Sequence, residues 1–160
     1  FIPLGAMQTC IVPVVSYNYA AKNITRCQKA LAGAVAFGVS LMALGTLCFV
    51  TVPGPMLRVF TSNAAVIAIG KVGFIFTGLS FLGMVPSLTF PVFFGAVGRG
   101  VQSALLTVLR TVILFVPLGY LFSRLGLNCF WLTFPVTEAV TTGVGFYWYR
   151  RFLKQPYRPK

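Results

Sequence analysis

The chain has 160 residues, of which 58% are hydrophobic and 9% are charged, and its mean hydropathy of +0.89 excludes a typical water-soluble domain. The formal net charge of +12 would suggest nucleic acid as the partner of a soluble protein. The basic residues, however, lie in short gaps between long uncharged stretches, so we expect them to mark the ends of membrane segments and predict no nucleic-acid partner.

Five long apolar segments follow in chain order, at residues 1–18, 30–52, 66–97, 103–123 and 128–149. An apolar helix of about 20 residues crosses the hydrocarbon layer of a membrane, which is about 30 Å thick. Strands of a membrane barrel would alternate polar and apolar residues, and these segments do not. The predicted fold is therefore an all-α polytopic membrane protein, a single transmembrane domain over residues 1–160 with about five helices and a tail at 150–160.

The first segment opens without an initiator Met and inside an apolar run, so we expect the chain to be the C-terminal part of a longer protein. No basic stretch precedes that run, and no signal peptide is predicted. Gln8 and Asn18 are polar residues of this segment. Since an amide in the apolar middle of a membrane must find a partner on another helix or face water, Gln8 is predicted either to join helices or to line a pathway.

The basic residues at the segment ends predict the orientation of the helices. If the segments alternate sides, one side receives the larger group, namely Lys22, Arg26, Lys29, Arg99, Arg150, Arg151, Lys154, Arg158 and Lys160. The other side receives Arg58, Lys71 and Arg124. Basic residues in short loops are retained in the cytoplasm, so the C-terminal tail is predicted to be cytoplasmic.

The third segment is longer than a membrane requires and contains Pro86 and Pro91. A proline inside a helix removes one backbone hydrogen bond and bends the axis. In membranes such breaks are tolerated where protein or a watery cavity takes up the freed carbonyls. The segment is predicted to be a bent helix that lines a cavity; the alternative is that glycine and proline are simply common in membrane helices.

Arg110 and Glu138 are the ionisable residues that fall inside the last two segments. An unpaired charge there costs at least about 2.5 to 3.5 kcal/mol on insertion scales. Arg110 lies roughly 21 Å from the membrane surface, counted from Arg124, and Glu138 lies roughly 15 Å from the same surface, counted from Asn128. Long side chains on adjacent helices can bridge this difference in depth. We predict a structural ion pair. The alternative is that Glu138 binds a coupling proton or cation, but a neighbouring guanidinium would keep the carboxylate ionised and make it a poor proton carrier.

Residues suited to catalysis or metal binding are scarce. The sequence has no His, no Asp, no carboxylate pair and no Gly-Lys-Ser/Thr loop. Its cysteines show no CxxC spacing and are expected to be small apolar fillers. Such a chain offers no groups for general acid and base chemistry or for holding a nucleotide phosphate. We predict that the protein is not an enzyme and has no cofactor and no metal site.

Three stretches resemble the MATE multidrug and toxin extrusion transporters. The region around the family's eighth helix resembles GAMQTCIVPVVSYNYAAKNITRCQKAL, with matches at Gln8, Pro13, Ser16, Tyr17, Asn18, Tyr19, Ala21, Asn23 and Arg26, and with Ala20 where the family usually has glycine. The link into the family's tenth helix is similar to MLRVFTSNAAVIAIG. Its last two helices resemble LLTVLRTVILFVPLGYLFSRLGLNCFWLTFPVTEAV, with matches at Arg110, Pro117, Gly126, Trp131, Pro135 and Glu138.

The resemblance implies a twelve-helix transporter of two lobes in the plasma membrane, which exports drugs and other bulky, often cationic compounds in exchange for protons or sodium ions. The chain would be the second lobe without its first helix, and its partners would be the lipid bilayer, the small organic substrates, the coupling ion and the N-terminal lobe. Because residues 66–98 contain no acid, the resemblance favours a coupling carboxylate in the absent first lobe.

The substrate path is predicted to include polar residues of the first segment and the bend of the third, namely Gln8, Asn18, Pro86, Thr89, Phe90 and Pro91. Aromatic and Met-rich walls adapt to varied ligands and attract cations. The third segment could supply such a wall with Phe81, Met84, Phe90, Phe93 and Phe94. The alternative for each phenylalanine is that it faces lipid or another helix.

Other functions stay open from the sequence. A lipid-linked saccharide flippase of the same wider superfamily would carry several cationic residues facing a central cavity, and only Arg110 is available. A non-transporting membrane scaffold would have no reason to keep a doubly broken helix, and would lack a cavity between residues 1–18 and 66–97. A soluble basic binding module would not partition into detergent.

Overall fold

The computed structural model describes residues 2–154, and within this range the chain forms helices and no strand. The all-α fold class predicted from the apolar segments is confirmed. In chain order the elements are α1 (Ile2–Ala20), α2 (Ile24–Thr51), α3 (Pro53–Arg58), α4 (Ala64–Ala96), α5 (Gly100–Val108), the π-helical turn η1 (Leu109–Leu114), α6 (Phe115–Leu125), α7 (Leu127–Phe130) and α8 (Thr133–Lys154).

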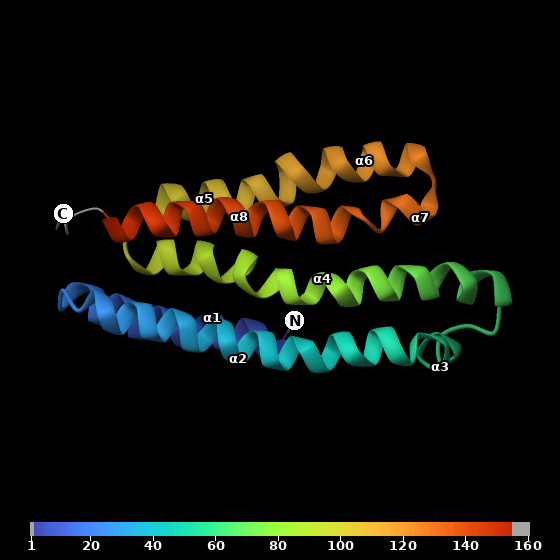
Figure 1. The fold of residues 1–160 in the computed structure, drawn as a ribbon, viewed down its shortest axis with the longest axis horizontal. Helices are drawn as coiled ribbons and strands as arrows, with labels where there is room; N and C mark the ends of the chain where they lie inside the picture. Colours follow the sequence, from blue (N-terminus) through green and yellow to red (C-terminus); the bar gives the residue numbers. More distant parts are fainter. Residues whose placement is uncertain (1, 155–160) are drawn as a thin grey trace.

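The long helices lie roughly side by side, with α4 in the middle (Figure 1). On one side α4 packs against α1 and α2, and on the other side it packs against α5 and α8. The elements α5, η1 and α6 follow one another without a break and form one rod over Gly100–Leu125. The short helices α3 and α7 lie at the connections between rods.

Within residues 2–154, three helical rods are long and apolar enough to cross a membrane: α2 with 28 residues, α4 with 33, and Gly100–Leu125 with 26. The other long helices, α1 with 19 residues and α8 with 22, contain no 18-residue stretch of comparable hydropathy. In α8 the polar side chains are turned inward, since Thr133, Thr137, Glu138 and Thr141 are all buried. A hydropathy average therefore understates how well α8 suits a lipid environment.

Three helix ends differ by five or six residues from those predicted. The helix α8 begins at Thr133 rather than at residue 128, since Leu127–Phe130 form the separate short helix α7. The helix α2 begins at Ile24 rather than at residue 30, because the side chain of Asn23 accepts a hydrogen bond from the backbone N–H of Arg26 (3.1 Å) and caps the helix. The helix α8 continues to Lys154, beyond the predicted end at 149. An apolar pattern marks where the chain enters lipid, whereas a helix can continue into water. The rest of the predicted tail, with Arg158 and Lys160, lies outside the described residues.

The helix α4 runs continuously through Pro86 and Pro91, and Figure 1 shows it bent rather than broken. Side chains from the helices on either side take up carbonyls before the bend. The hydroxyl of Thr46 donates to the carbonyl of Gly78 (2.7 Å), and that of Thr142 donates to the carbonyl of Gly83 (3.2 Å). The bend predicted from the prolines is present, and polar groups of α2 and α8 hold α4 beside it.

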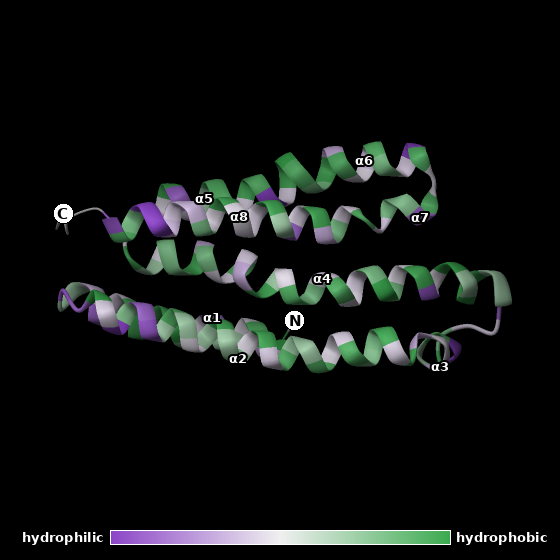
Figure 2. Ribbon diagram, in the orientation of Figure 1, coloured by the Kyte–Doolittle hydropathy of each residue, from purple (hydrophilic) through white to green (hydrophobic). Residues whose placement is uncertain are grey.

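Strongly hydrophilic residues are most frequent toward the two ends of the rods (Figure 2), where the connections between the rods carry most of the basic residues. The α1–α2 turn, the α4–α5 turn and the end of α8 lie at one end, while α3 and the α6–α7 connection lie at the other (Figure 1). Lys22, Arg99 and Arg150 therefore share one end, and Arg58 and Arg124 share the other. This is the grouping that alternating segments require.

Glycines let the rods approach closely. A Cβ atom added at Gly38, Gly73, Gly78 or Gly145 would lie 2.6 to 2.7 Å from a side chain packed against it, so each of these positions excludes a larger residue without local movement. Close backbone approach at small residues is the usual way that helices associate in a membrane, where there is no hydrophobic driving force between them.

Candidate functional site

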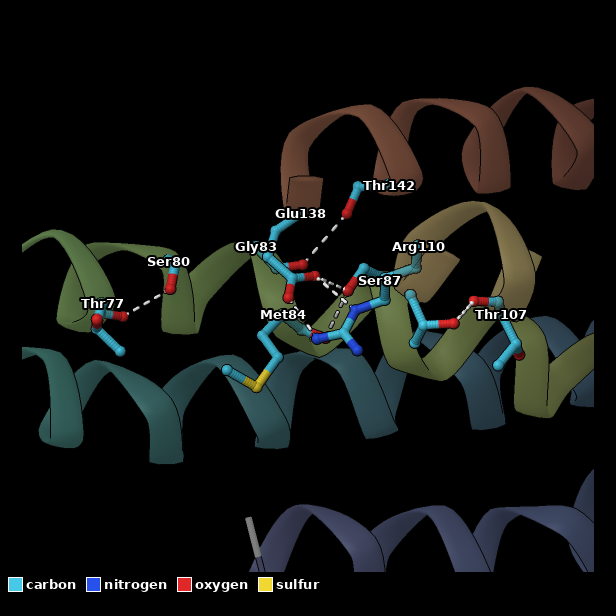
Figure 3. A network of polar contacts seen from close by, with 10 residues as sticks. Thr77, Ser80, Gly83, Met84, Ser87, Thr107, Arg110, Glu138 and Thr142 are labelled. Atoms are coloured by element: carbon cyan, nitrogen blue, oxygen red, sulfur yellow. Dashed lines mark hydrogen bonds and ion pairs between the residues drawn. The ribbon is translucent and has the colours of Figure 1, made fainter. Parts of the chain in front are cut away.

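A charged network joins three rods in the middle of the bundle (Figure 3). The guanidinium of Arg110 donates to both carboxylate oxygens of Glu138, from Nη2 to Oε1 at 2.5 Å and from Nε to Oε2 at 3.2 Å. The hydroxyl of Ser87 on α4 also donates to Oε2 of Glu138. The Glu138 side chain is 5% exposed and that of Arg110 is 21% exposed. The structure thus brings together the two intramembrane charges that the sequence analysis paired, and adds Ser87.

Arg110 lies on η1, the π-helical turn of its rod. The N–H of Phe115 donates to the carbonyl of Arg110, five residues earlier, as π geometry requires. Downstream, Pro117 has no N–H and its ring would collide with the carbonyl four residues before it in an α-helix. The wider turn relieves this conflict. Single π turns inside α-helices occur frequently at functional sites, and Pro117 was the available sequence signal for this one.

Glycine and threonine residues shape the contact between α4 and α8 around the network. A Cβ at Gly83 would lie 3.1 Å from the Cβ of Glu138, so the absence of a side chain there lets α8 approach α4. On α8, the buried hydroxyls of Thr133, Thr137 and Thr141 share one face because they are four residues apart, and they find no hydrogen-bond partner among the described residues. This face of α8 therefore carries more hydroxyl groups than the network of Arg110, Glu138 and Ser87 uses.

A cavity of about 280 Å³ opens against the ion pair. This volume is close to the lower limit of about 300 Å³ for small-molecule pockets. The lining combines three phenylalanines, a methionine, three threonines and the ion pair, and consists of Thr77, Phe81, Met84, Arg110, Thr111, Phe115, Phe134, Thr137 and Glu138. Since the two charges neutralise each other, the cavity is a mainly aromatic space with hydroxyl groups at its edge, suited to a small amphipathic molecule.

The residues predicted for the substrate path lie elsewhere in the bundle. Asn18 donates to the carbonyl of Val14 (2.7 Å) in its own helix, and Thr89 donates likewise to Val85 (2.6 Å). Phe90 is buried in the core, 5.9 Å from the ring of Tyr149. None of the predicted path residues, Gln8, Asn18, Pro86, Thr89, Phe90 and Pro91, lines this cavity. The buried amide nitrogen of Gln8 has no hydrogen-bond partner among the described residues, so this nitrogen is available to donate a hydrogen bond.

The predicted aromatic wall is divided between the cavity and the core. Phe81 and Met84 line the cavity, whereas Phe93 and Phe94 are buried in the main core cluster with Phe90. Phe115 and Phe134 also line the cavity although they were not predicted to, and their rings meet edge to face at 5.3 Å. Their positions depend on how α6 and α8 pack, and no local pattern distinguishes them from lipid-facing phenylalanines. The spacing of Thr133, Thr137 and Thr141 beside Glu138 was a usable signal for the polar face.

A family model described as MatE matches residues 1–121, which leaves the end of α6 and all of α7 and α8 outside the match. A comparison with curated protein sequences gives no match.

Solved structures with the same fold are similar to this chain at low identity. A MOP superfamily transporter from Pyrococcus furiosus, described as having a binding pocket of reversed polarity, superposes with a TM-score of 0.87 and 21% identity over 97% of this chain and 36% of its own. A MATE protein in complex with MaL6 superposes with a TM-score of 0.83 and 21% identity, over 95% of this chain and 35% of its own. An outward-facing multidrug resistance MATE family transporter superposes with a TM-score of 0.84 and 22% identity, over 95% of this chain and 35% of its own. At these identities the likeness establishes the fold, and the chain spans about a third of the length of these proteins.

Proposed function

Because the chain belongs to the MatE family of multi-pass membrane transporters, we propose that it is part of a cation-coupled antiporter that exports drugs or other organic cations across the plasma membrane in exchange for protons or sodium ions. The observation that carries the proposal is the family match over residues 1–121. The transporter fold supports it, and one of the proteins with this fold is described as a multidrug resistance transporter.

The chain supplies part of the second lobe, and an N-terminal lobe and the lipid bilayer cover its apolar outer faces. Large apolar residues remain exposed along the rods, for example Leu44 at 63%, Leu121 at 55% and Val116 at 61%. A surface of this kind is stable only against lipid or another apolar protein face. The share of the solved transporters that the chain covers, 35–36%, leaves room for such a lobe.

The aromatic cavity beside Arg110 forms this lobe's part of the substrate path. Aromatic faces attract organic cations, and methionine adapts its shape to different ligands. The ion pair holds η1 and α8 together and serves a structural role, while coupling depends on a carboxylate in the other lobe. Gln8 and Asn18 of α1 and the bend around Pro86, Thr89, Phe90 and Pro91 stay predictions for the parts of the path that the two lobes form together.

The end of the bundle that carries Lys22, Arg99 and Arg150 faces the cytoplasm. The proposal is supported by the excess of basic residues at that end, since such residues are retained on the cytoplasmic side. A reporter fused to the C-terminus of the complete protein should be active only in the cytoplasm, and activity outside the cell would reverse the assignment.

The proposed exchange predicts that export depends on an ion gradient. Cells expressing the complete transporter should lose a fluorescent cationic dye faster than cells without it, and the difference should vanish when either the proton or the sodium gradient is collapsed. Collapsing the gradients one at a time identifies the coupling ion. Efflux that is insensitive to both treatments would exclude antiport.

Replacing Phe115 with leucine should weaken the apparent affinity for a cationic dye about fivefold. The substitution keeps an apolar side chain but removes a ring that lines the cavity, and a cation over an aromatic face is worth about 1 kcal/mol. The matched control is Phe122→Leu on the same helix, at a position outside this cavity's lining. Equal effects of both variants on the dye concentration giving half-maximal transport would remove the cavity from the substrate path.

The cavity gives less support to the two rival functions. A flippase for lipid-linked saccharides needs several cationic residues facing its cavity, and the cavity has Arg110 alone, already bound to Glu138. A scaffold has no need for an aromatic cavity inside its bundle. The cavity beside Arg110 is not lined by a residue of α1, so the cavity expected between residues 1–18 and 66–97 stays a prediction.

A further inference from the structure

A second cavity lies at the basic end of the bundle, far along the rods from the ion pair. Its volume is about 380 Å³, and its walls come from the end of α4, the first turns of α5 and the last turns of α8. The lining combines two arginines, an amide and apolar side chains, and consists of Phe94, Arg99, Val101, Gln102, Leu105, Trp148 and Arg151. The transport mechanism proposed above uses none of these residues.

The polar groups of this cavity suit a phosphate. Arginine presents planar donors that match phosphate oxygens, and two arginines line this cavity, Arg99 in the α4–α5 turn and Arg151 on α8. Gln102 adds an amide donor. Arg99 also precedes the first turn of α5, where the backbone N–H groups have no partners within the helix and favour an anion. The guanidinium of Arg99 lies 4.8 Å from the centre of the Phe152 ring, which restricts its position.

The apolar groups of the cavity suit a lipid rather than a soluble anion. Val101 and Leu105 in the lining are 70% and 49% exposed, and Val108 and Val112 continue the same stripe at 44% and 56%. Their spacing places them on one face of the rod. This stripe leads from the arginines toward the middle of the bundle, as an acyl chain would. Trp148 supplies an amphipathic ring of the kind favoured at headgroup depth.

We propose that this cavity binds the phosphate of an anionic membrane lipid, with Arg99, Arg151 and Gln102 on the headgroup and the apolar stripe of α5 and η1 against an acyl chain. Basic pockets between membrane helices recognise such headgroups on the cytoplasmic side. Because Arg99 joins α4 to α5 and Arg151 lies on α8, the bound lipid would connect three rods at one end of the lobe.

The test uses the complete transporter, purified and placed in bilayers of defined composition. Wild-type protein should melt at a higher temperature in bilayers containing phosphatidylglycerol than in phosphatidylcholine alone, because a ligand that binds only the folded state stabilises it. The double variant Arg99→Gln/Arg151→Gln should need about 30-fold more phosphatidylglycerol for the same shift, since each basic residue near the surface contributes to anionic lipid binding. Inorganic phosphate added to phosphatidylcholine bilayers should produce no shift; a shift equal to that with phosphatidylglycerol would mean a soluble anion is the ligand.

The matched control removes two charges from the same end without touching the cavity. Arg150 lies over the Phe146 ring at 4.7 Å and Lys154 is exposed, and neither lines the cavity. The variant Arg150→Gln/Lys154→Gln should keep nearly all of the lipid-dependent shift. If the two double variants lose the shift equally, the attraction is diffuse and the proposed site does not exist.

A second variant guards against a folding defect in the arginine variant. Val101→Glu places a carboxylate at the mouth of the cavity, on an exposed position in the first turn of α5, where a negative charge is favourable for the helix. It should melt like wild type in phosphatidylcholine and lose the shift in phosphatidylglycerol. A full shift in this variant would overturn the proposal.

Discussion

Replacing Arg110 with methionine in the complete transporter is expected to lower the free energy of unfolding by about 3 to 5 kcal/mol. Removing one partner of a buried ion pair leaves the other charge uncompensated, and Glu138, at 5% exposure, would keep only the hydroxyl of Ser87. Methionine retains most of the side-chain volume, so the loss reports on charge rather than on packing. Thermal or denaturant unfolding in detergent measures the difference.

The matched control is Arg124→Met at the end of the same rod. Arg124 is exposed and donates to the hydroxyl of Tyr120 at 2.7 Å, so its loss should change stability by less than about 1 kcal/mol. The double variant Arg110→Met/Glu138→Gln should recover much of the stability, because removing both charges is less costly than removing one. If Arg110→Met and Arg124→Met lose equal stability, the pair does not hold the rods together.

Replacing Gly145 with alanine is expected to destabilise the protein by about 1 to 3 kcal/mol through overpacking. A Cβ at this position would lie 2.6 Å from Cδ2, 3.0 Å from Cγ and 3.1 Å from Cβ of Phe90. Atoms so close to the backbone of α4 move only if the helix moves, and Phe90 is buried in the core cluster. The contact between α4 and α8 would have to open.

Gly143 provides the comparison on the same helix. A Cβ there would meet nothing within 4 Å, so Gly143→Ala should be neutral or stabilise the helix by up to about 1 kcal/mol. If Gly145→Ala lowers the melting temperature and Gly143→Ala raises it, the close contact between α4 and α8 lies at Gly145. Equally small effects of both substitutions on the melting temperature would show that α4 and α8 pack more loosely at Gly145 than they do in the structure.

The ion pair could be predicted because the chain offers so few choices. A membrane makes an isolated charge costly, and the sequence contains one acidic residue and one arginine inside the predicted segments to match it. Depth along the helices then decided whether the two could meet. The contribution of Ser87 could not be predicted, because it depends on which face of α4 turns toward α8 at the proline bend.

The cavity lining was harder to predict than the fold. Apolar segments define rods but not which face of each rod is covered. In a helix such as α4, the few polar residues are scattered among apolar ones and form no polar face that would orient it. Phe81 and Phe90 lie on the same helix, yet one lines the cavity and the other fills the core. The difference depends on the glycines that admit neighbouring helices, as Gly145 does for Phe90. Such pairings belong to tertiary packing and leave no local signal.

The proposed function requires that the complete protein exchange an organic cation for a proton or a sodium ion. The most direct measurement uses purified protein in sealed vesicles, with a fluorescent cationic dye on one side and an imposed gradient of one ion at a time. Antiport predicts that one of the two gradients drives the dye across the membrane, in the opposite direction to the ion. Dye movement that is independent of both gradients would contradict the proposed antiport. So would the absence of dye movement while a lipid-linked saccharide crosses the bilayer.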